Sequence, residues 1–481
     1  MTAAERVIAQ FCQFFVFIVA ARMLGPAEFG TYALVSAFAI LLLRASEVGW
    51  APYIMSWAGD AAVPRQVLTL AAGCGVVFGA IGLAASGVVA ALGIDAEIVI
   101  LIQLFSVWVA IATLSSAQKG MMVWQKRLRL SALCEIAGEI VGLCVSLATL
   151  LSGWGVLSIA FGRLSFQTTH LVLSFLATRT WPALGFEARM LTELWVFSRH
   201  FFAARMLANI KLYAATFIIG GALGPTEVGY FRVAERLVGA VGEVIAVPAQ
   251  LLSWAVLKDA RDGDATSGIG GARMKTQLMS FIRLLWVISV PLFVWLIVTS
   301  DVLIEDLLSS EWLPAVPLVA LLAISRLLTT SAIATEPLLS LTGQSRILPR
   351  LSLTMLVIAV GTTLLAVPFG LYAVAWAQVV GALLLLGVTL YIFHRFAKVT
   401  PLEFILDIRG IVAPLAVAIA ALLLADHALA IYTPIPPLLQ TVLSALFATG
   451  IYIAALAVLA RATLRQLIGR GHVPPVNEVQ T

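Results

Sequence analysis

The sequence predicts an all-α protein that crosses a membrane many times, and three observations lead to this fold class. Hydrophobic residues make up 61% of the 481-residue chain. Charged residues make up only 11%, whereas soluble proteins usually carry about 25%. Many apolar runs reach the roughly 20 helical residues needed to cross the hydrocarbon core of a bilayer. These runs are too long and too continuous for the short alternating strands of a membrane β-barrel.

Fourteen apolar runs, bounded by charged residues, proline or glycine, are predicted to form transmembrane helices. They span residues 6–24, 27–57, 66–92, 97–118, 130–152, 154–177, 195–222, 226–257, 276–299, 314–340, 347–368, 370–395, 410–425 and 436–460. The first run has the composition of a signal peptide. An internal repeat indicates that it belongs to the mature fold instead.

The segment that follows the first predicted helix recurs 199 residues later, after the seventh. Residues 24–30 read Leu-Gly-Pro-Ala-Glu-Phe-Gly, and residues 223–229 read Leu-Gly-Pro-Thr-Glu-Val-Gly. Three further matches follow in the same order. They pair Pro52 with Pro248, Gln125 with Gln344, and Gly155 with Gly370. The chain is therefore predicted to contain two six-helix lobes. Because each lobe has an even number of helices, the repeats are expected to be parallel, an architecture found in transporters.

This repeat defines the predicted domain organisation. A linker between the lobes places apolar residues among charges, as in an amphipathic segment that lies on the membrane surface. The predicted parts are an N-terminal lobe at 1–178, a cytosolic amphipathic linker at 179–194, a C-terminal lobe at 195–396, a linker with two additional transmembrane helices at 397–462, and a cytosolic tail at 463–481.

The distribution of positive charge predicts the orientation. With a cytosolic N-terminus, the inner segments contain 21 of the 30 Lys and Arg residues and the outer loops contain one. Cytoplasmic loops of membrane proteins carry such an excess, so both termini are expected in the cytosol. No loop is long enough for a soluble catalytic domain, and no phosphate-binding loop motif occurs. We expect no enzyme, no cofactor, no metal and no nucleic-acid partner.

The cysteines and paired glycines are predicted to serve helix packing rather than metal binding or redox chemistry. The four cysteines lie in apolar runs without the spacing of a metal or redox site, and we interpret them as core residues: Cys12, Cys74, Cys134 and Cys144. Two glycine pairs spaced four residues apart permit close helix contacts: Gly75 with Gly79, and Gly138 with Gly142. His170 and His200 are either structural or proton carriers.

Fourteen charged residues fall inside the predicted helices. Each costs about 2.5 to 3.5 kcal/mol at the bilayer centre and is expected to face a protein interior or a watery cavity. The basic residues are Arg44, Arg163, Arg205, Lys211, Arg232, Arg236, Arg283 and Arg326, and the acidic residues are Glu47, Glu135, Glu139, Glu235, Glu243 and Glu336. The surplus of two cations favours a cavity for an anionic head group.

The depth of each charge along its helix predicts its role. Five cations lie about 10 to 20 Å from the outer helix ends and are the predicted head-group contacts: Arg163, Lys211, Arg232, Arg236 and Arg326. Arg44 and Arg205 are expected near the cytosolic mouth. Arg232, Arg236, Gly239 and Glu243 share one helix face because of their spacing. Three carboxylates are candidates for ion or proton coupling, since burial can raise the pKa of a carboxyl group: Glu47, Glu235 and Glu243.

The alternative interpretation is that these cations only neutralise neighbouring acids. The candidate pairs are Arg44 with Glu47, Arg232 and Arg236 with Glu235, and Arg163 with Glu139 or Glu135. Lys211 and Arg326 have no acid within one helical turn. Arg283 lies near the start of its helix, where its long side chain can extend to the interface.

Two motifs resemble a known family. Residues 24–32, Leu-Gly-Pro-Ala-Glu-Phe-Gly-Thr-Tyr, resemble the opening of the polysaccharide-biosynthesis flippases, and Leu341-Thr342-Gly343-Gln344 is also similar. These are the O-antigen and exopolysaccharide repeat-unit exporters of the multidrug/oligosaccharidyl-lipid/polysaccharide (MOP) superfamily. The resemblance implies two lobes in a V that alternate between inward-open and outward-open states. It implies transport of an undecaprenyl-pyrophosphate-linked oligosaccharide to the outer leaflet.

The resulting hypothesis is a flippase of the bacterial inner membrane that moves a polyprenyl-pyrophosphate-linked oligosaccharide by alternating access through a cationic central cavity. Its expected partners are this glycolipid, membrane lipids, and the polysaccharide polymerase and export machinery. The two extra C-terminal helices resemble those of the lipid II flippase, which is one alternative. A multidrug antiporter of the same superfamily and a membrane glycosyltransferase or polymerase are the others.

Overall fold

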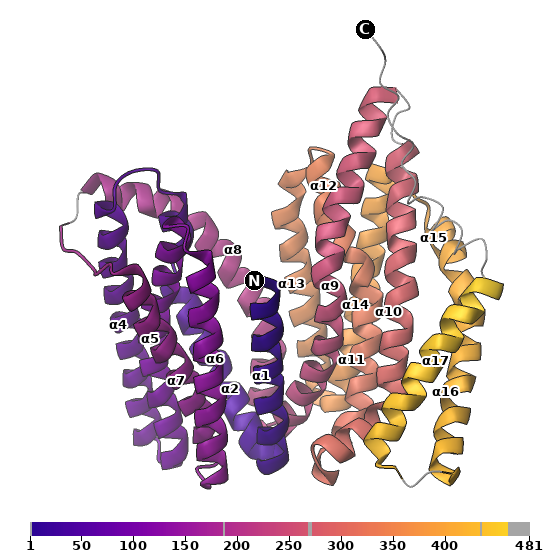
Figure 1. Cartoon of the computed structure of the whole chain (residues 1–481), viewed down its shortest axis with the longest axis horizontal. Coiled ribbons are helices and arrows are strands. Elements are labelled where there is room, and N and C mark those ends of the chain that lie inside the picture. Colours follow the sequence, from indigo (N-terminus) through magenta and orange to yellow (C-terminus); the bar gives the residue numbers. More distant parts are fainter. Residues whose placement is uncertain (1, 186–187, 268–271, 433–434, 460–481) are drawn as a thin grey trace. The chain divides into compact units, whose positions relative to one another are not determined.

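A computed structural model describes residues 2–185, 188–267, 272–432 and 435–459 of the chain (Figure 1). These residues form helices, with no β-strand among them. Eleven helical stretches are long and apolar enough to cross a membrane, and a shorter apolar helix covers Ile8–Met23. The prediction of an all-helical polytopic membrane fold is confirmed. The predicted cytosolic tail at 463–481 lies outside the described residues.

The chain divides into two compact units, Met1–Arg232 and Val233–Thr481. The first unit contains eight helices and the beginning of a ninth. They are α1 (Thr2–Met23), α2 (Pro26–Ser46), α3 (Trp50–Ser56), α4 (Ala62–Ala91), α5 (Ala96–Trp124), α6 (Leu128–Leu151), α7 (Leu157–Thr178), α8 (Ala188–Ala222) and the start of α9 (Pro225–Ser267).

The second unit contains the remainder of α9 and the helices that follow. The α-helices are α10 (Ala272–Leu307), α11 (Val316–Thr329), α12 (Thr335–Leu341), α13 (Leu348–Ala366), α14 (Leu371–Ala397), α15 (Pro401–Ile408), α16 (Val412–Tyr432) and α17 (Pro437–Leu459). Short 3₁₀ helices connect several of them: η1 (Ser310–Ala315), η2 (Thr330–Ala334), η3 (Ser345–Ile347), η4 (Val367–Phe369) and η5 (Arg409–Ile411).

Two predicted helices are interrupted in the structure. The range 27–57 was expected to be one helix, but it breaks between α2 and α3 because Gly49 has φ +109°, a left-handed conformation that glycine adopts without strain from a Cβ atom. The range 314–340 changes to a 3₁₀ helix over Thr330–Ala334, between α11 and α12. Apolar run length predicts a span, but it does not show where the backbone leaves the α-helical conformation.

The predicted linker at 179–194 includes a segment without helix and the beginning of α8. Residues 179–185 form no helix, and α8 starts at Ala188 within the predicted linker range. The backbone of this segment is attached to α4, because Arg65 Nε donates to the carbonyl oxygen of Trp181 (3.0 Å) and the Ala183 amide donates to the carbonyl oxygen of Arg65 (3.1 Å). These bonds satisfy backbone groups that a helix would otherwise have paired internally.

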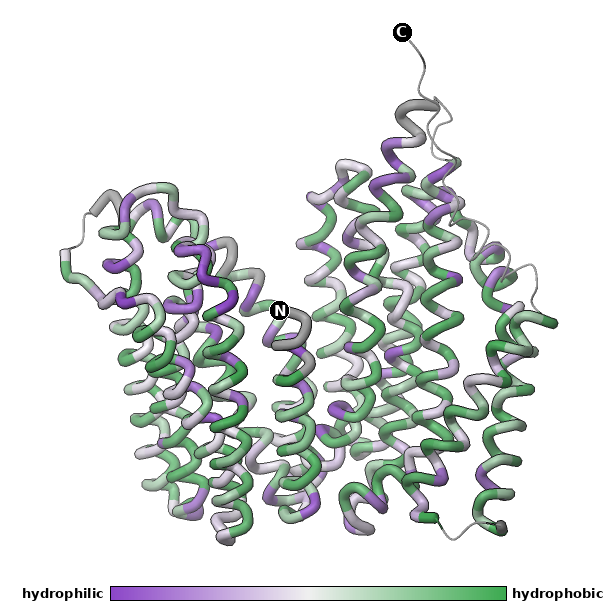
Figure 2. The backbone as a smooth tube through the Cα atoms, in the orientation of Figure 1, coloured by the Kyte–Doolittle hydropathy of each residue, from purple (hydrophilic) through white to green (hydrophobic). Residues whose placement is uncertain are grey.

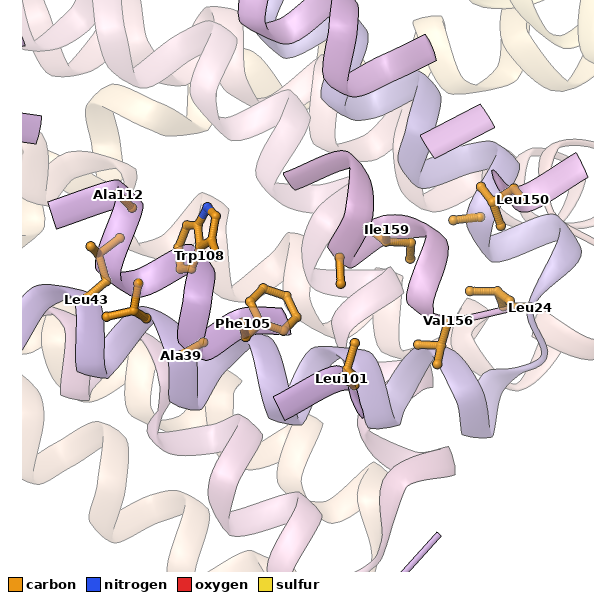
Figure 3. Close-up of a cluster of buried hydrophobic side chains, with 13 residues drawn as sticks. Leu24, Ala39, Leu43, Leu101, Phe105, Trp108, Ala112, Leu150, Val156 and Ile159 are labelled. Atoms are coloured by element: carbon orange, nitrogen blue, oxygen red, sulfur yellow. The ribbon is translucent and has the colours of Figure 1, made fainter. Parts of the chain in front are cut away.

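Side-chain burial agrees with a lipid-facing surface. Figure 2 shows hydrophobic residues along most of the length of the helices. Large apolar side chains are exposed on them, for example Val244 (71%) and Leu365 (77%). A buried apolar cluster in the first unit joins α2, α5, α6 and α7 (Figure 3). In this cluster, Phe105 and Trp108 of α5 make an edge-to-face contact with ring centroids 5.8 Å apart.

The two predicted glycine pairs lie at close helix contacts. A Cβ atom on Gly75 of α4 would lie 2.7 Å from the carbonyl oxygen of Ala110 in α5, and one on Gly142 of α6 would lie 2.9 Å from the carbonyl oxygen of Gly162 in α7. The pairs α4 with α5 and α6 with α7 therefore pack backbone against backbone, as small residues allow in membranes.

The two copies of the repeated motif lie against each other within the first unit. A Cβ atom on Gly30 would lie 1.7 Å from the carbonyl oxygen of Pro225, and one on Gly229 would lie 2.1 Å from the carbonyl oxygen of Pro26. The contact is reciprocal, since each glycine faces the first proline of the other copy. Only glycine fits both positions without movement of the backbone.

The cysteines are partly as predicted. Cys12 and Cys134 are buried, and Cys74 is half-buried. Cys144 is exposed on α6, so its assignment to the core is wrong. The error has a simple cause: in a membrane protein the outward face of a helix is as apolar as its inward face, so hydropathy does not separate the two.

Candidate functional site

The predicted site residues are distributed over both units. The first unit contains Arg44, Glu47, Arg163, Arg205, Lys211 and Arg232, and the second contains Glu235, Arg236, Glu243 and Arg326. In the first unit the side chains gather in two groups. We call them the Arg163 cluster (Gln13, Tyr32, Glu139, Arg163, Tyr213 and Arg232) and the Glu47 cluster (Arg44, Glu47 and Arg205).

The Arg163 cluster centres on a guanidinium enclosed by several helices. Arg163 projects from α7 and interacts with the hydroxyl of Tyr32 on α2 and with the carboxylate of Glu139 on α6. Glu139 is buried and also accepts a hydrogen bond from Gln13 Nε2 of α1 (2.8 Å). A buried carboxylate and a guanidinium stabilise each other's charged form in an apolar surrounding. The expected pairing of Arg163 with Glu139 or Glu135 stays a prediction, and the interaction with Glu139 supports the first of these two partners.

Tyr213 of α8 connects Arg163 to a second cation. Its hydroxyl interacts electrostatically with Arg163, and the guanidinium carbon of Arg232 lies 5.4 Å from its ring centroid. This distance is typical of a cation–π contact. Two of the five predicted head-group cations thus share one tyrosine. The guanidinium groups of both residues can donate charge-assisted hydrogen bonds to an anionic ligand.

The Glu47 cluster lies where α2 ends. The Oε2 atom of Glu47 accepts a bond from Arg44 Nη1 (2.5 Å) and lies 3.4 Å from Arg205 Nη1 of α8. The predicted pair between Arg44 and Glu47 is confirmed, and Arg205 completes a group in which two cations share one carboxylate. This group has a formal charge of +1.

The remaining predicted residues differ in exposure. Lys211 on α8 and Glu235 and Arg236 on α9 are half-buried, whereas Glu243 and Arg326 are exposed. Arg326 stands in the last turn of α11, directly before the chain changes to a 3₁₀ helix. The hydroxyls of Thr329 and Thr330 both donate to its carbonyl oxygen at 3.0 Å. Arg326 therefore lies at a helix end whose backbone is stabilised by these two side-chain hydrogen bonds.

Two charged residues have partners that the sequence did not indicate. Glu135 forms an ion pair with Lys119 of α5. Arg283 does not simply extend to the interface, because it forms a two-point ion pair with Asp407 of α15, in which Nε lies 2.9 Å from Oδ2. Lys119 and Glu135 are 16 residues apart and Arg283 and Asp407 are 124 apart, and no local spacing rule reaches across such separations.

Sequence reasoning missed the two tyrosines of the Arg163 cluster. It considered only residues with a formal charge, and Tyr32 and Tyr213 have none at neutral pH. The one available signal was position, since Tyr32 lies in the family-like motif at 24–32 and Tyr213 is two residues from Lys211.

His170 has a structural contact, because its Nδ1 lies 2.6 Å from Ser115 Oγ in a buried position. The side chain of His200 lies outside the described part of the structure.

Comparison with solved structures shows a transporter fold. The chain is similar to a structure titled "Lipid II flippase MurJ, inward closed conformation", with a TM-score of 0.74, 13% identity, and coverage of 96% of this chain and 99% of that chain. It is also similar to an inward-facing multidrug resistance MATE family transporter of the MOP superfamily, with a TM-score of 0.63, 15% identity, and coverage of 83% and 95%. At these identities the likeness establishes the fold.

Comparison with known sequences identifies the family. A curated relative, the teichuronic acid biosynthesis protein TuaB of Bacillus subtilis (strain 168), is 21% identical over 232 residues, which is 47% of this chain and 46% of that protein. The family described as "Polysaccharide biosynthesis protein" matches residues 19–317. The resemblance seen in the sequence motifs is confirmed, and the comparisons support a transporter rather than an enzyme. The chain belongs to the polysaccharide biosynthesis protein family and has the fold of MOP superfamily transporters.

Proposed function

We propose that the protein is a flippase that moves a polyprenyl-pyrophosphate-linked oligosaccharide, a polysaccharide repeat unit, across the bacterial inner membrane by alternating access through a cationic cavity. In this proposal Arg163, Lys211, Arg232, Arg236 and Arg326 contact the head group, and Arg44 and Arg205 receive it at the cytosolic mouth. An ion or proton gradient drives transport, with Glu47, Glu235 and Glu243 as the candidate coupling acids.

The observation that carries this proposal is the Arg163 cluster. It places two guanidiniums around one tyrosine within helices that are otherwise apolar. Charges at membrane depth are costly, and they mark substrate or ion pathways when they are kept. Guanidinium groups bind phosphate oxygens through paired, charge-assisted hydrogen bonds. A diphosphate flanked by a sugar and a lipid tail supplies the matching charge.

The comparisons support the substrate class. The curated relative takes part in teichuronic acid biosynthesis, and the structure with a TM-score of 0.74 is a lipid II flippase. One name points to a polysaccharide and the other to a lipid-linked substrate. A lipid-linked polysaccharide repeat unit combines both properties, and lipid II is the alternative substrate within the same class.

The proposed orientation and lobes follow from charge and repeats. Both termini are cytosolic, the two six-helix lobes span 1–178 and 195–396, and the segment from 397 to 462 adds two helices. A polysaccharide polymerase and export machinery act on the delivered repeat unit. These partners are proposed from the family alone.

Glycan export in cells tests the function. We expect a gene deletion to stop display of the polysaccharide and to accumulate lipid-linked repeat units, and the wild-type gene to restore export. Lys211→Ala and Arg326→Ala should restore the protein level in the membrane without restoring export. Normal export by both variants would remove these two residues from the site, and unchanged glycan display in the deletion strain would contradict the function itself.

A multidrug antiporter is the second candidate, because the fold also matches a MATE transporter. Guanidinium groups repel cationic drugs, so the proposed contacts Arg163 and Arg232 disfavour this function. A drug-susceptibility screen separates the two: increased sensitivity of the deletion strain to several cationic drugs, with normal glycan export, would favour the antiporter.

A further inference from the structure

The Glu47 cluster combines a buried carboxylate with two accessible guanidiniums. Glu47 is 6% exposed, whereas the side chains of Arg44 and Arg205 are 31% and 44% exposed. Both guanidiniums approach the same carboxylate oxygen, Oε2, each through one Nη1 atom. The carboxylate is thus covered by protein, and the cations that hold it remain open to an incoming anion.

Both guanidiniums keep donors for another ligand. An arginine side chain has five N–H donors, and in the described part of the chain each of these two uses only Nη1 in a side-chain bond. Arginine prefers to bind a carboxylate or phosphate through two parallel bonds. Glu47 receives one contact from each arginine, so neither guanidinium has its preferred geometry.

Neighbouring residues hold the backbone of Glu47 at the helix break. Ser46, just before it, pairs with Thr113 of α5 (2.5 Å between hydroxyl oxygens). Gly49, two residues after it, adopts the left-handed conformation at the N-cap of α3. The carboxylate is therefore anchored at the helix break, whereas Arg44 and Arg205 reach it through long side chains from α2 and α8. An exchange of partners requires movement of the two side chains alone.

We propose that Glu47 is an internal substitute for the diphosphate of the substrate. In the unloaded protein it neutralises Arg44 and Arg205, and an arriving diphosphate displaces it from both guanidiniums. This inference rests on the proposed function and adds that Glu47 competes with the substrate for the two arginines. Displacement leaves the buried carboxylate of Glu47 with weaker ion pairs, and a buried charge without its partners raises the free energy of the protein. Part of the gain from diphosphate binding is thereby offset, so the site holds its substrate loosely enough to release it.

The same competition gives selectivity. A monovalent anion has the same charge as the Glu47 carboxylate, so it attracts the two guanidiniums no more strongly and does not displace the carboxylate. A diphosphate brings more charge and can bind both guanidiniums in the two-point geometry that arginine prefers. The cluster therefore favours diphosphate over chloride.

Binding of inorganic pyrophosphate to the purified full-length protein in detergent tests this proposal. We expect Glu47→Gln to bind pyrophosphate roughly three- to tenfold more tightly than wild type, since a charge-assisted competitor is removed. Arg205→Gln and Arg44→Gln should bind it more weakly. Glu135→Gln is the matched control, because it removes a carboxylate that pairs with Lys119 in the same unit, and its affinity should equal that of wild type.

Three results would overturn the proposal. One is equal or weaker binding by Glu47→Gln, which would make Glu47 only a tie between α2 and α8. Another is an equal gain in Glu135→Gln, which would indicate a general effect of net charge. The third is a gain in Glu47→Asp as large as in Glu47→Gln, because the shorter residue retains the competing charge. If Glu47→Gln does not fold, the pyrophosphate affinity of Glu47→Asp is compared with that of wild type instead, and a higher affinity would contradict the proposal.

The proposed function has a separate readout, which is glycan export in cells. If export depends on the head-group cations but Glu47→Gln shows no gain in pyrophosphate affinity, the exchange is wrong and the flippase proposal stands. If neither wild type nor any variant binds pyrophosphate, recognition of the diphosphate by this cluster is wrong.

Discussion

Arg163 shows how a charge is maintained within an apolar helix bundle. Its guanidinium has a carboxylate partner in Glu139 and a hydroxyl partner in Tyr32, and Glu139 has an additional donor in Gln13. Because several partners satisfy the group, no single one has to neutralise it completely.

Replacement of Arg163 tests whether it serves the substrate or only Glu139. Arg163→Ala should lower export roughly tenfold or more, because a hydrogen bond to a charged group contributes about 1.5 to 3 kcal/mol. It should also destabilise the protein, since Glu139 would remain buried without its cation. Export is measured as surface glycan per amount of protein in the membrane.

The double variant Arg163→Gln with Glu139→Gln separates the two effects. It removes both charges, so we expect stability close to wild type and export as low as in Arg163→Ala. Arg129→Ala, at an exposed position at the start of α6, is the control and should export normally. Normal export by the stable double variant would show that Arg163 serves packing only.

The Arg283–Asp407 pair is predicted to serve stability. The two side chains are 13% and 14% exposed and meet through two bonds. Loss of one partner from a buried ion pair costs about 3 to 5 kcal/mol. Asp407→Ala should therefore lower the unfolding temperature in detergent by several degrees, whereas Arg283→Met with Asp407→Leu should recover most of it. An unfolding temperature of Asp407→Ala equal to that of wild type would show that the pair contributes nothing.

At the scale of elements, helix breaks position the polar groups. Glu47 occupies the break between α2 and α3, and Arg326 lies one turn before η2. In both places the chain leaves the α-helical hydrogen-bond pattern next to a predicted site residue. Irregular backbone at membrane depth is tolerated where it is buried in protein or lines a cavity, so these breaks agree with a polar interior.

The reciprocal glycine contact between α2 and α9 gives a prediction for packing. Gly229→Ala should destabilise the protein by about 1 to 3 kcal/mol, because the added methyl group would overlap the carbonyl oxygen of Pro26 and force the helices apart. Gly242→Ala on the same helix meets no atom within 4 Å and should be neutral or stabilising by about 0.5 to 1 kcal/mol. Thermal unfolding in detergent measures both, and equal effects would contradict the contact.

At the scale of the whole molecule, two compact units are covered by exposed apolar side chains. Such a surface is stable only in lipid or detergent, since a soluble protein rarely exposes large apolar patches. The excess of Lys and Arg on one predicted side then decides which way the chain inserts.

Cysteine labelling tests this orientation. In a variant without the four native cysteines, Asp95→Cys should react with a membrane-impermeant maleimide in intact cells, because it lies in a predicted outer loop and is exposed. Arg129→Cys, exposed in a predicted cytosolic loop, should react only after the membrane is opened. The reverse pattern would invert the topology.

Much of the fold could be predicted because membrane helices leave a strong local signal. The described part of the chain has eleven helical stretches able to cross a membrane and one shorter apolar helix, and the repeated glycines at 30 and 229 meet in space. The site was less predictable. Charge and depth pointed to Arg163, but Tyr32, Tyr213 and Gln13 are uncharged and come from three other helices. Nothing in their local spacing indicates a shared partner.

The sequence by itself determined that the chain forms apolar helices long enough to cross a membrane and that it carries an internal repeat. These properties depend on hydropathy and residues close in the chain, because a helix satisfies its own backbone hydrogen bonds. Only the tertiary structure decided which charges pair: Glu135 with Lys119, Asp407 with Arg283, and Glu47 with both Arg44 and Arg205. Pairing depends on distances between helices, and the packing of whole helices sets those distances.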